Sequence, residues 1–216
     1  MQNFVDFLKN KLQNELPGVD SQQIMTPKFK GKPFRNIVAG DDAKRSSVLL
    51  ILEEQNSTNK FDIILTLRSS NLNKHSGQIS FPGGRIDEGE TEIDAAKRET
   101  FEEIGLESNY YEMIGKLSTL FVPPSNNIIT PFIALLNSKP IYDANPDEVE
   151  EIFSVPIDNL VKNDSIKYYT DVFNGIEVEI PYFDVHPTTK LWGATSMILS
   201  ELLVIYKEYL GKFETK

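Results

Sequence analysis

The 216-residue sequence contains no cysteine, two histidines and one tryptophan, and its 32 acidic residues outnumber its 22 basic ones. The lack of cysteine excludes disulfides, thiolate-ligated zinc and a thiol nucleophile. The formal net charge of −10 argues against a surface that neutralises nucleic-acid phosphates with lysine and arginine. An acidic protein can still bind phosphates where a divalent cation lies between the negative groups. We therefore expect no nucleic-acid partner.

Long hydrophobic runs are also missing. The longest, at 47–52 and 202–206, fall far short of the ~20 residues that a membrane-spanning helix requires. Residues 1–16 have apolar side chains at helical spacing with charged residues among them, which predicts an amphipathic helix rather than a signal peptide. These features predict a cytoplasmic protein with no membrane partner.

Strand and helix patterns alternate along the chain. Strands are expected at 47–52, 62–68, 78–81, 113–120, 128–136 and 148–153, and helices at 91–104, 156–163 and 191–210. Asn174-Gly175 between two β-prone runs predicts a late hairpin over 166–183. Thr91 and Asp94 form a helix-start pattern, and Gly105 provides the matching stop. The mixture indicates an α/β or α+β class with a mixed sheet in one domain, 1–216.

Acidic residues concentrate between Gly84 and Gly105, where eight acids accompany three bases. On a helix, Glu99, Glu102 and Glu103 share one face within a single turn and repel one another. A hard divalent cation such as Mg²⁺ or Mn²⁺ would offset this repulsion, whereas a solvated acidic face is the alternative. The same geometry predicts a buried stripe beside the acids, made of Ile93, Ala96, Thr100 and Ile104.

Fixed spacing extends this cluster into a longer motif. Gly84 is followed after five residues by Glu90, and after seven more by residues 98–106 (RETFEEIGL). The segment 84–106 resembles the Nudix box, G-x5-E-x7-R-E-U-x-E-E-x-G-U with U aliphatic, and departs from it at Thr100. The resemblance implies a hydrolase of nucleoside diphosphate-linked compounds. It also implies a Nudix-type α/β/α sandwich, to which an N-terminal extension of about 1–40, the late hairpin and the C-terminal helix are added.

The resemblance implies roles for individual residues. Glu99 and Glu103 would ligate Mg²⁺ or Mn²⁺, Glu102 would be a further ligand or the base, and the Gly84 carbonyl would be an extra ligand. Arg98 would hold a carboxylate in place. The acidic segment 147–152 resembles a late Nudix segment that completes the metal site or provides the base. Its candidates are Glu148 and Glu151, with a solvated loop charge as the alternative.

A second motif narrows the substrate. Residues 64–69 (ILTLRS), Gly77 and residues 81–84 (FPGG) resemble the motif of the coenzyme A pyrophosphatase branch of the Nudix enzymes. This implies hydrolysis of coenzyme A or its derivatives to 3′,5′-ADP and 4′-phosphopantetheine. The implied substrate contacts are Arg68, Ser69, Lys74, His75 and Gly83. For Arg68, a strand-end guanidinium suits a phosphate, and an exposed charge is the alternative.

Several alternatives stay open. The motif's second arginine is Asn73 here, so Lys74 or His75 would have to supply that cation. For this reason ADP-ribose, NADH or another nucleotide remains an alternative substrate, and a non-catalytic nucleotide-sensing module is a further possibility. The hairpin aromatics Tyr168, Tyr169 and Phe173 are expected in the core, with adenine stacking as the alternative, and His186 is expected to be structural. A homodimer is left open.

Overall fold

The computed structural model describes residues 3–29, 32–33, 39–70, 76–173 and 175–213. Its helices are α1 (Phe4–Gln13), α2 (Gly18–Gln23), α3 (Glu92–Ile104), α4 (Ile157–Leu160) and α5 (Gly193–Phe213), with 3₁₀ turns at Ser108–Tyr110 and Pro123–Ser125. Its strands are β1 (Lys28–Phe29), β2 (Lys32–Pro33), β3 (Lys44–Glu54), β4 (Phe61–Arg68), β5 (Ile79–Ser80), β6 (Gly83–Arg85), β7 (Tyr111–Lys116), β8 (Leu120–Val122), β9 (Asn127–Leu136), β10 (Val149–Pro156), β11 (Ile166–Phe173) and β12 (Ile176–Phe183).

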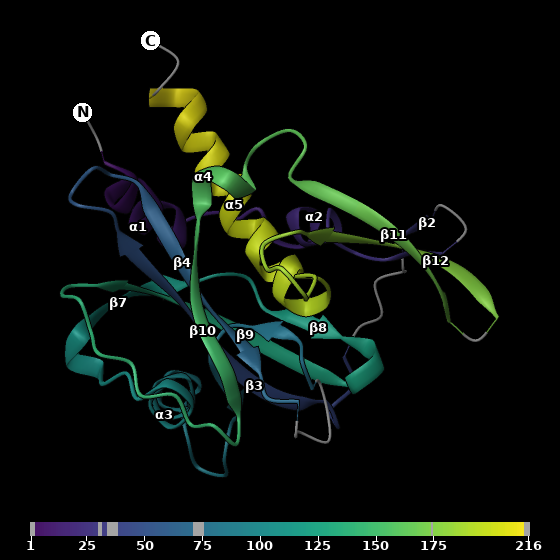
Figure 1. Ribbon diagram of the computed structural model, residues 1–216, viewed down its shortest axis with the longest axis horizontal. Coiled ribbons are helices and arrows are strands. Elements are labelled where there is room, and N and C mark those ends of the chain that lie inside the picture. The colour runs from purple at the N-terminus through teal and green to yellow at the C-terminus, as the bar shows by residue number, and fades with distance from the viewer. Residues whose placement is uncertain (1–2, 30–31, 34–38, 71–75, 174, 214–216) are drawn as a thin grey trace.

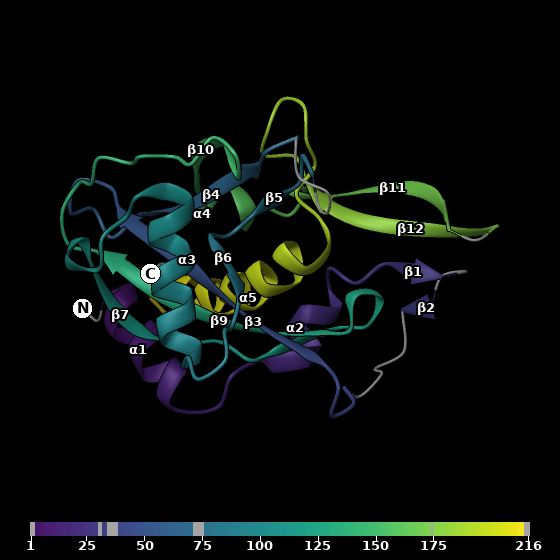
Figure 2. The same ribbon diagram turned by 90° about the horizontal axis from the view of Figure 1, so that it is seen from below.

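The main sheet has the strand order β10-β4-β3-β9-β7, with β5, β6 and β8 paired to β4, β3 and β9. Strands β3 and β9 run parallel and the other pairs antiparallel, so the sheet is mixed as predicted. Helix α3 covers one face, and α1 and α5 cover the other (Figures 1 and 2). The α/β/α layering expected from the sequence is confirmed. No helix among the described residues is long and apolar enough to cross a membrane.

Strand β3 lies in the middle of this sandwich and is buried on both faces. Leu50 and Leu52 belong to the core shared with α1 and α5, while Leu49 and Ile51 belong to the core shared with α3. A strand covered on both sides is an unbroken apolar run rather than an alternating one. This explains why 47–52 contains no alternation in its sequence.

Glu201 fastens the N-terminal segment to α5, although it is a fully buried carboxylate. It accepts hydrogen bonds from the Ser118 hydroxyl at 2.7 Å, the Gly18 amide at 3.0 Å, the Ser118 amide at 3.2 Å and the Gln22 side chain at 3.4 Å. Hydrogen bonding of this kind is what makes a buried charge tolerable. Helix α2 and the connection between β7 and β8, which contains Ser118, are thereby held against the C-terminal helix α5.

The acidic helix α3 begins and ends where the sequence predicts. The Thr91 hydroxyl accepts a hydrogen bond from the Asp94 amide at 3.2 Å, which caps the first turn. Gly105 has a left-handed backbone with φ of 67°, and its amide donates to the Phe101 carbonyl at 2.8 Å. These two ends fix which residues of α3 face the sheet. Ala96, Thr100 and Ile104 are buried as predicted, whereas Ile93, the first member of the predicted stripe, is only partly buried.

The late hairpin is confirmed, but the placement of its aromatics is not. Strands β11 and β12 pair over their whole predicted lengths, with Phe173 opposite Ile176. They belong to a second sheet of order β11-β12-β1-β2 that extends away from the main sheet (Figures 1 and 2). Phe173 is 63% exposed and Tyr168 50% exposed, so the expected core position is wrong for both, and Tyr169 is only partly buried. The reason is that β11 is the outermost strand of a small sheet, and no helix or second sheet among the described residues packs over these side chains.

Two tyrosines in the α3-side core bury hydroxyls that have no hydrogen-bond partner in the described part of the chain, Tyr111 and Tyr142. Burial raises the pKa of each to about 12. Because an unpaired buried hydroxyl costs free energy that a C–H group would not, Tyr111→Phe should leave the free energy of unfolding unchanged or raise it by about 1 kcal/mol. Urea unfolding of the two proteins measures this. A loss above about 1 kcal/mol would show that the Tyr111 hydroxyl has a partner.

Candidate active site

The glycine turn Gly83-Gly84 brings the main chain directly under helix α3. Strand β6 pairs with β3 so that Gly84 lies opposite Ser47. A Cβ at Gly84 would lie 2.3–2.4 Å from the carboxylate atoms of Glu99, so only glycine permits this approach. At Gly83 the constraint is the backbone itself: its φ is +147°, and a Cβ would lie 2.3 Å from the Ser47 carbonyl oxygen. The acidic cluster therefore packs directly against the main chain of this turn.

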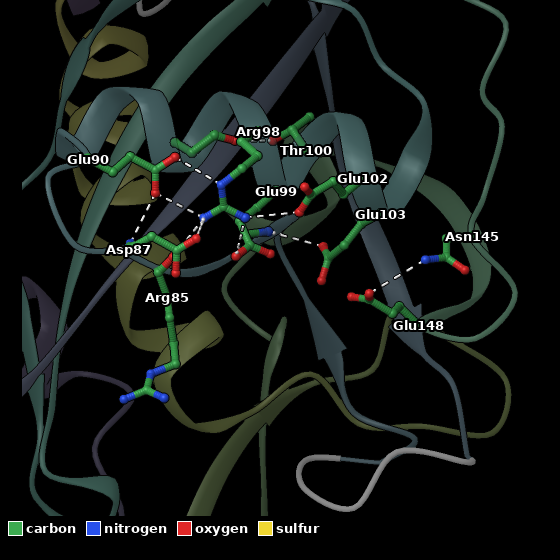
Figure 3. Close-up of polar contacts among 12 residues, drawn as sticks. Arg85, Asp87, Glu90, Arg98, Glu99, Thr100, Glu102, Glu103, Asn145 and Glu148 are labelled. Carbon is green, nitrogen blue, oxygen red and sulfur yellow. Dashed lines mark hydrogen bonds and ion pairs between the residues drawn. The ribbon is translucent and has the colours of Figure 1, made fainter.

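Arg98 organises the solvent side of the cluster. Its Nε and Nη2 donate to the two oxygens of Glu90 at 2.9 and 3.0 Å, a bidentate contact (Figure 3). Its Nη1 donates to Glu99 at 3.0 Å and to Glu102 at 2.9 Å, and Nη2 also donates to the Arg85 carbonyl at 3.0 Å. The hydrogen bond from Arg98 lowers the pKa of Glu90. Arg98 thus hydrogen-bonds three carboxylates and lies 3.8 Å from a fourth, that of Asp87, where the sequence resemblance implied one.

Glu103 lies deeper and is not a solvated charge. Its side chain is 1% exposed, which makes the solvated-face alternative wrong for this residue. One carboxylate oxygen accepts from Arg68 Nη1 at 2.9 Å and the other from the Gly83 amide at 3.1 Å. Burial nonetheless raises the pKa of Glu103 to about 7, against the lowering effect of Arg68 and the amide. Burial disfavours the charged form of Glu103, so additional positive charge nearby would stabilise its carboxylate.

Glu99 and Glu148 complete the group from two different elements. Burial, followed by the charges of Glu102 and Glu148, raises the pKa of Glu99, while Arg98 opposes the shift. Glu148 precedes β10 and faces α3, and among the described residues its carboxylate accepts a single long contact, from the Asn145 side chain at 3.5 Å (Figure 3). The other late-segment candidate, Glu151, instead contacts His186 at 3.1 Å. Of the two predicted acids, the structure brings Glu148 to the cluster, and His186 packs against Phe153 as a structural residue.

The donor chemistry of this cluster suits a hard divalent cation. Glu99, Glu102, Glu103 and Glu148 supply carboxylate oxygens, which Mg²⁺ and Mn²⁺ prefer. Arg98 and Arg68 carry the positive charge opposite them. Within the described ranges, no three side chains of metal-ligating type converge on one point. The carboxylate oxygens face the two arginines and the Gly83 amide, so ligation would replace part of these contacts.

Only some of the predicted substrate contacts are found beside the acidic cluster in the described part of the chain. Arg68 ends β4 beside the cluster and points to Glu103, and the Gly83 amide is also bound to Glu103. Ser69 is 4% exposed, and its amide donates to the Glu148 carbonyl at 2.9 Å, so it lies beneath the surface. Asn73, Lys74 and His75 lie outside the described residues. Arg68 is therefore the predicted substrate contact whose side chain touches the acidic cluster and is partly exposed to solvent.

Two features of the site were not singled out from the sequence. Glu90 was named only as a motif position, yet it makes the bidentate contact with Arg98. Its spacing of eight residues from Arg98 was the available signal. A hollow of about 620 Å³ lies beside Glu102, lined by Phe101, Glu102, Gly105, Glu107, Asp143, Ala144, Asn145 and Pro146. Phe101 is an exposed aromatic ring on α3, a position that helical spacing marks as solvent-facing.

Comparison with known proteins places this geometry in context. A family model described as the NUDIX domain matches residues 43–172. The chain is 30% identical to Nudix hydrolase 3 of Caenorhabditis elegans, over 78% of this chain and 76% of that protein. It is 32% identical to a peroxisomal coenzyme A diphosphatase of the same organism, over 76% and 68% of the two chains. It is 33% identical to the mitochondrial Nudix hydrolase 15 of Arabidopsis thaliana, over 72% and 56%.

A solved structure supports the fold. The MutT/nudix family protein from Enterococcus faecalis aligns with a TM-score of 0.51 at 14% identity, covering 82% of this chain and 66% of that one. At this identity the likeness extends to the fold only. The named relatives belong to different compartments, one mitochondrial and one peroxisomal, so the cytoplasmic location expected from the sequence stays a prediction.

Proposed function

Because the chain belongs to the Nudix hydrolase family, whose members are pyrophosphohydrolases acting on nucleoside diphosphate-linked compounds, we propose that it hydrolyses the diphosphate linkage of coenzyme A or its derivatives. The observation that carries this proposal is the grouping of acids around Glu99, which lies against the glycine turn: the charges of Glu102 and Glu148 act on Glu99, and the charge of Glu99 acts on Glu103. The coenzyme A assignment is supported by the 64–84 motif and by the similarity to a coenzyme A diphosphatase. The products would be 3′,5′-ADP and 4′-phosphopantetheine.

Nudix hydrolases generally use divalent metal ions. In this chain Glu99, Glu103, Glu102 and the carbonyl of Gly84 would hold Mg²⁺ or Mn²⁺. Such an ion neutralises the charge of a diphosphate and makes water a stronger nucleophile at neutral pH. The carboxylates themselves cannot approach a diphosphate without it, since both groups are negative.

Residues of the chain would orient the carboxylates, bind a substrate phosphate and accept the proton of the attacking water. Arg98 orients Glu99 and Glu102 through its fork, and Arg68 would turn from Glu103 toward a substrate phosphate. A carboxylate removes a proton from the attacking water as its oxygen bonds to phosphorus, and the bridging oxygen leaves with the other phosphate. We assign this base to Glu148 rather than Glu102, because Arg98 occupies an oxygen of Glu102 at 2.9 Å, whereas within the described residues the carboxylate of Glu148 has one contact, at 3.5 Å.

The hollow beside Glu102 would accommodate part of the substrate next to the diphosphate. Phe101 contributes an apolar side chain to its lining, and Asn145 contributes a polar one. An exposed aromatic ring next to a catalytic cluster suits the flat face of an adenine.

The substrate proposal predicts a ranking of kcat/KM. With Mg²⁺ or Mn²⁺, coenzyme A should be hydrolysed at least about 10-fold more efficiently than ADP-ribose or NADH, a difference of about 1.4 kcal/mol in transition-state binding. Chromatography of the nucleotide products, with coenzyme A expected to give 3′,5′-ADP, measures this. Turnover of ADP-ribose with none of coenzyme A would reject the substrate while leaving the hydrolase intact. Asn73, in place of the motif's second arginine, is the feature that favours this outcome.

A further inference from the structure

The outer strand of the small sheet, β11, has a free edge. In the order β11-β12-β1-β2, no described strand pairs with β11 on the side away from β12. The hairpin projects from the body of the molecule, with β11 on its outer side (Figures 1 and 2). Val172 and Phe173 near its tip are 61% and 63% exposed. A long exposed edge of this kind is a template for pairing with another strand.

The register shows which backbone groups this edge presents. Phe173 and Ile176 flank a two-residue connection, and flanking residues of such hairpins are a hydrogen-bonded pair. By alternation, odd-numbered residues of β11 bond to β12. The even-numbered ones direct their N–H and C=O groups outward, namely Ile166, Tyr168, Thr170 and Val172.

Two contacts agree with this alternation. Phe183 of β12, opposite Ile166, exchanges hydrogen bonds with Leu191 at 2.9 and 3.0 Å, on the side away from β11. The Val172 amide on the free edge donates to the Asp171 carboxylate at 2.7 Å instead of to a neighbouring strand. The outward groups of β11 are therefore those of its even-numbered residues.

We propose that β11 pairs antiparallel with β11 of a second copy of this chain, with the two-fold axis at Tyr169. This register joins even-numbered residues to even-numbered residues, so the outward groups of both strands meet. It places Thr170 opposite Tyr168 and Val172 opposite Ile166. It also places Lys167 opposite Asp171, twice by symmetry, which is a favourable cross-strand charge pair.

Neighbouring registers lack this complementarity. An axis at Tyr168 would place Lys167 opposite Tyr169, and an axis at Thr170 would place it opposite Phe173. An axis at Asp171 would place two aspartates opposite each other, and an axis at Lys167 two lysines. Lys167 also contacts Asp184 of its own chain at 2.6 Å. Its ammonium has three donors, so it can hold both carboxylates. Sequence and register together thus select one mode of pairing.

Sedimentation equilibrium of the full chain tests the proposal through its mass. The wild-type mass should rise with concentration from 24.5 kDa toward twice that value. Asp171→Lys alone and Lys167→Glu alone each place like charges opposite each other, so each should stay at the monomer mass. Mixed in equal amounts, the two variants should recover the doubled mass. In the mixed pair, the unchanged Lys167 of one copy meets the unchanged Asp171 of the other, and the two introduced charges, which have opposite signs, also meet across the axis.

A proline provides a second, independent test. Thr170→Pro removes an amide that points outward, so the β11–β12 hairpin should persist, as its circular dichroism and its coenzyme A turnover would show. This variant should have half the wild-type mass, whereas the matched control Thr170→Val should retain the doubled mass. A wild-type protein that is monomeric at every concentration would overturn the proposal. Recovery that fails in the mixture would overturn the register.

Discussion

Replacing Glu99 with glutamine should lower Mg²⁺-dependent turnover by about 10²–10³-fold. The carboxylate of Glu99 lies against the main chain of Gly84 and is held by Arg98 at 3.0 Å. The amide of glutamine keeps the size of the side chain but removes its charge, so it binds a divalent cation poorly and leaves Arg98 with one fewer anionic partner. Steady-state kinetics over a range of Mg²⁺ concentrations measures the loss.

Metal titration separates this effect from loss of the base. Mn²⁺ binding, followed by electron paramagnetic resonance, should weaken in Glu99→Gln, while Glu148→Gln should keep most of its Mn²⁺ affinity and lose turnover. The matched control is Glu88→Gln, an exposed acid in the same motif for which the structure shows no role in the cluster. Equal Mn²⁺ affinity and turnover in Glu99→Gln and the wild type would contradict the metal-site assignment.

The parts of the site within one segment were predictable from the sequence. A helical period of about 100° per residue places Glu99, Glu102 and Glu103 on one face, and local caps at Thr91 and Gly105 set that helix in register. These features depend only on neighbours within one turn. The structure accordingly confirms the helix, its two ends and its buried stripe.

The parts that required two segments were not predictable with the same detail. The Arg68–Glu103 ion pair joins residues 35 positions apart, and helical spacing cannot reveal it. Glu148 comes to the cluster because β10 pairs with β4, placing Val149 opposite Arg68. The sequence offered Glu148 and Glu151 equally. The register of two strands decides between them, because only Glu148 ends up beside α3.

The burial of the hairpin aromatics could not be predicted from the local sequence either. Alternation along β11 predicts a strand, but it does not tell whether a second layer covers each face. Tyr168 and Phe173 lie on the outermost strand of a small sheet and stay half exposed or more, although the Lys28 ammonium lies 5.3 Å from the centre of the Tyr168 ring. Burial is thus a property of sheet order, which depends on where β1 and β2 join.

Alanine at the two glycines of the turn should affect different properties. We expect Gly83→Ala to lower stability and Gly84→Ala to lower turnover, so the pair tests how the fold and the site are connected. At Gly83 the new Cβ would meet main-chain atoms, the Ser47 oxygen at 2.3 Å and the Val48 Cα at 2.6 Å, on a backbone with φ of +147°. Main chain in the middle of a sheet cannot move aside, so Gly83→Ala should lower the free energy of unfolding by about 3 kcal/mol or more. Thermal and urea unfolding measure the loss.

At Gly84 the three atoms nearest to the new Cβ, at 2.3–2.4 Å, all belong to the end of the flexible Glu99 side chain. That carboxylate can rotate away, so Gly84→Ala should change stability by less than about 1 kcal/mol yet lower turnover nearly as much as Glu99→Gln does. Gly211→Ala, where a Cβ meets nothing within 4 Å, is the control for both. If Gly84→Ala kept full activity, Glu99 could not need its position against the turn, and the chemistry would have to depend on Glu102, Glu103 and Glu148 instead.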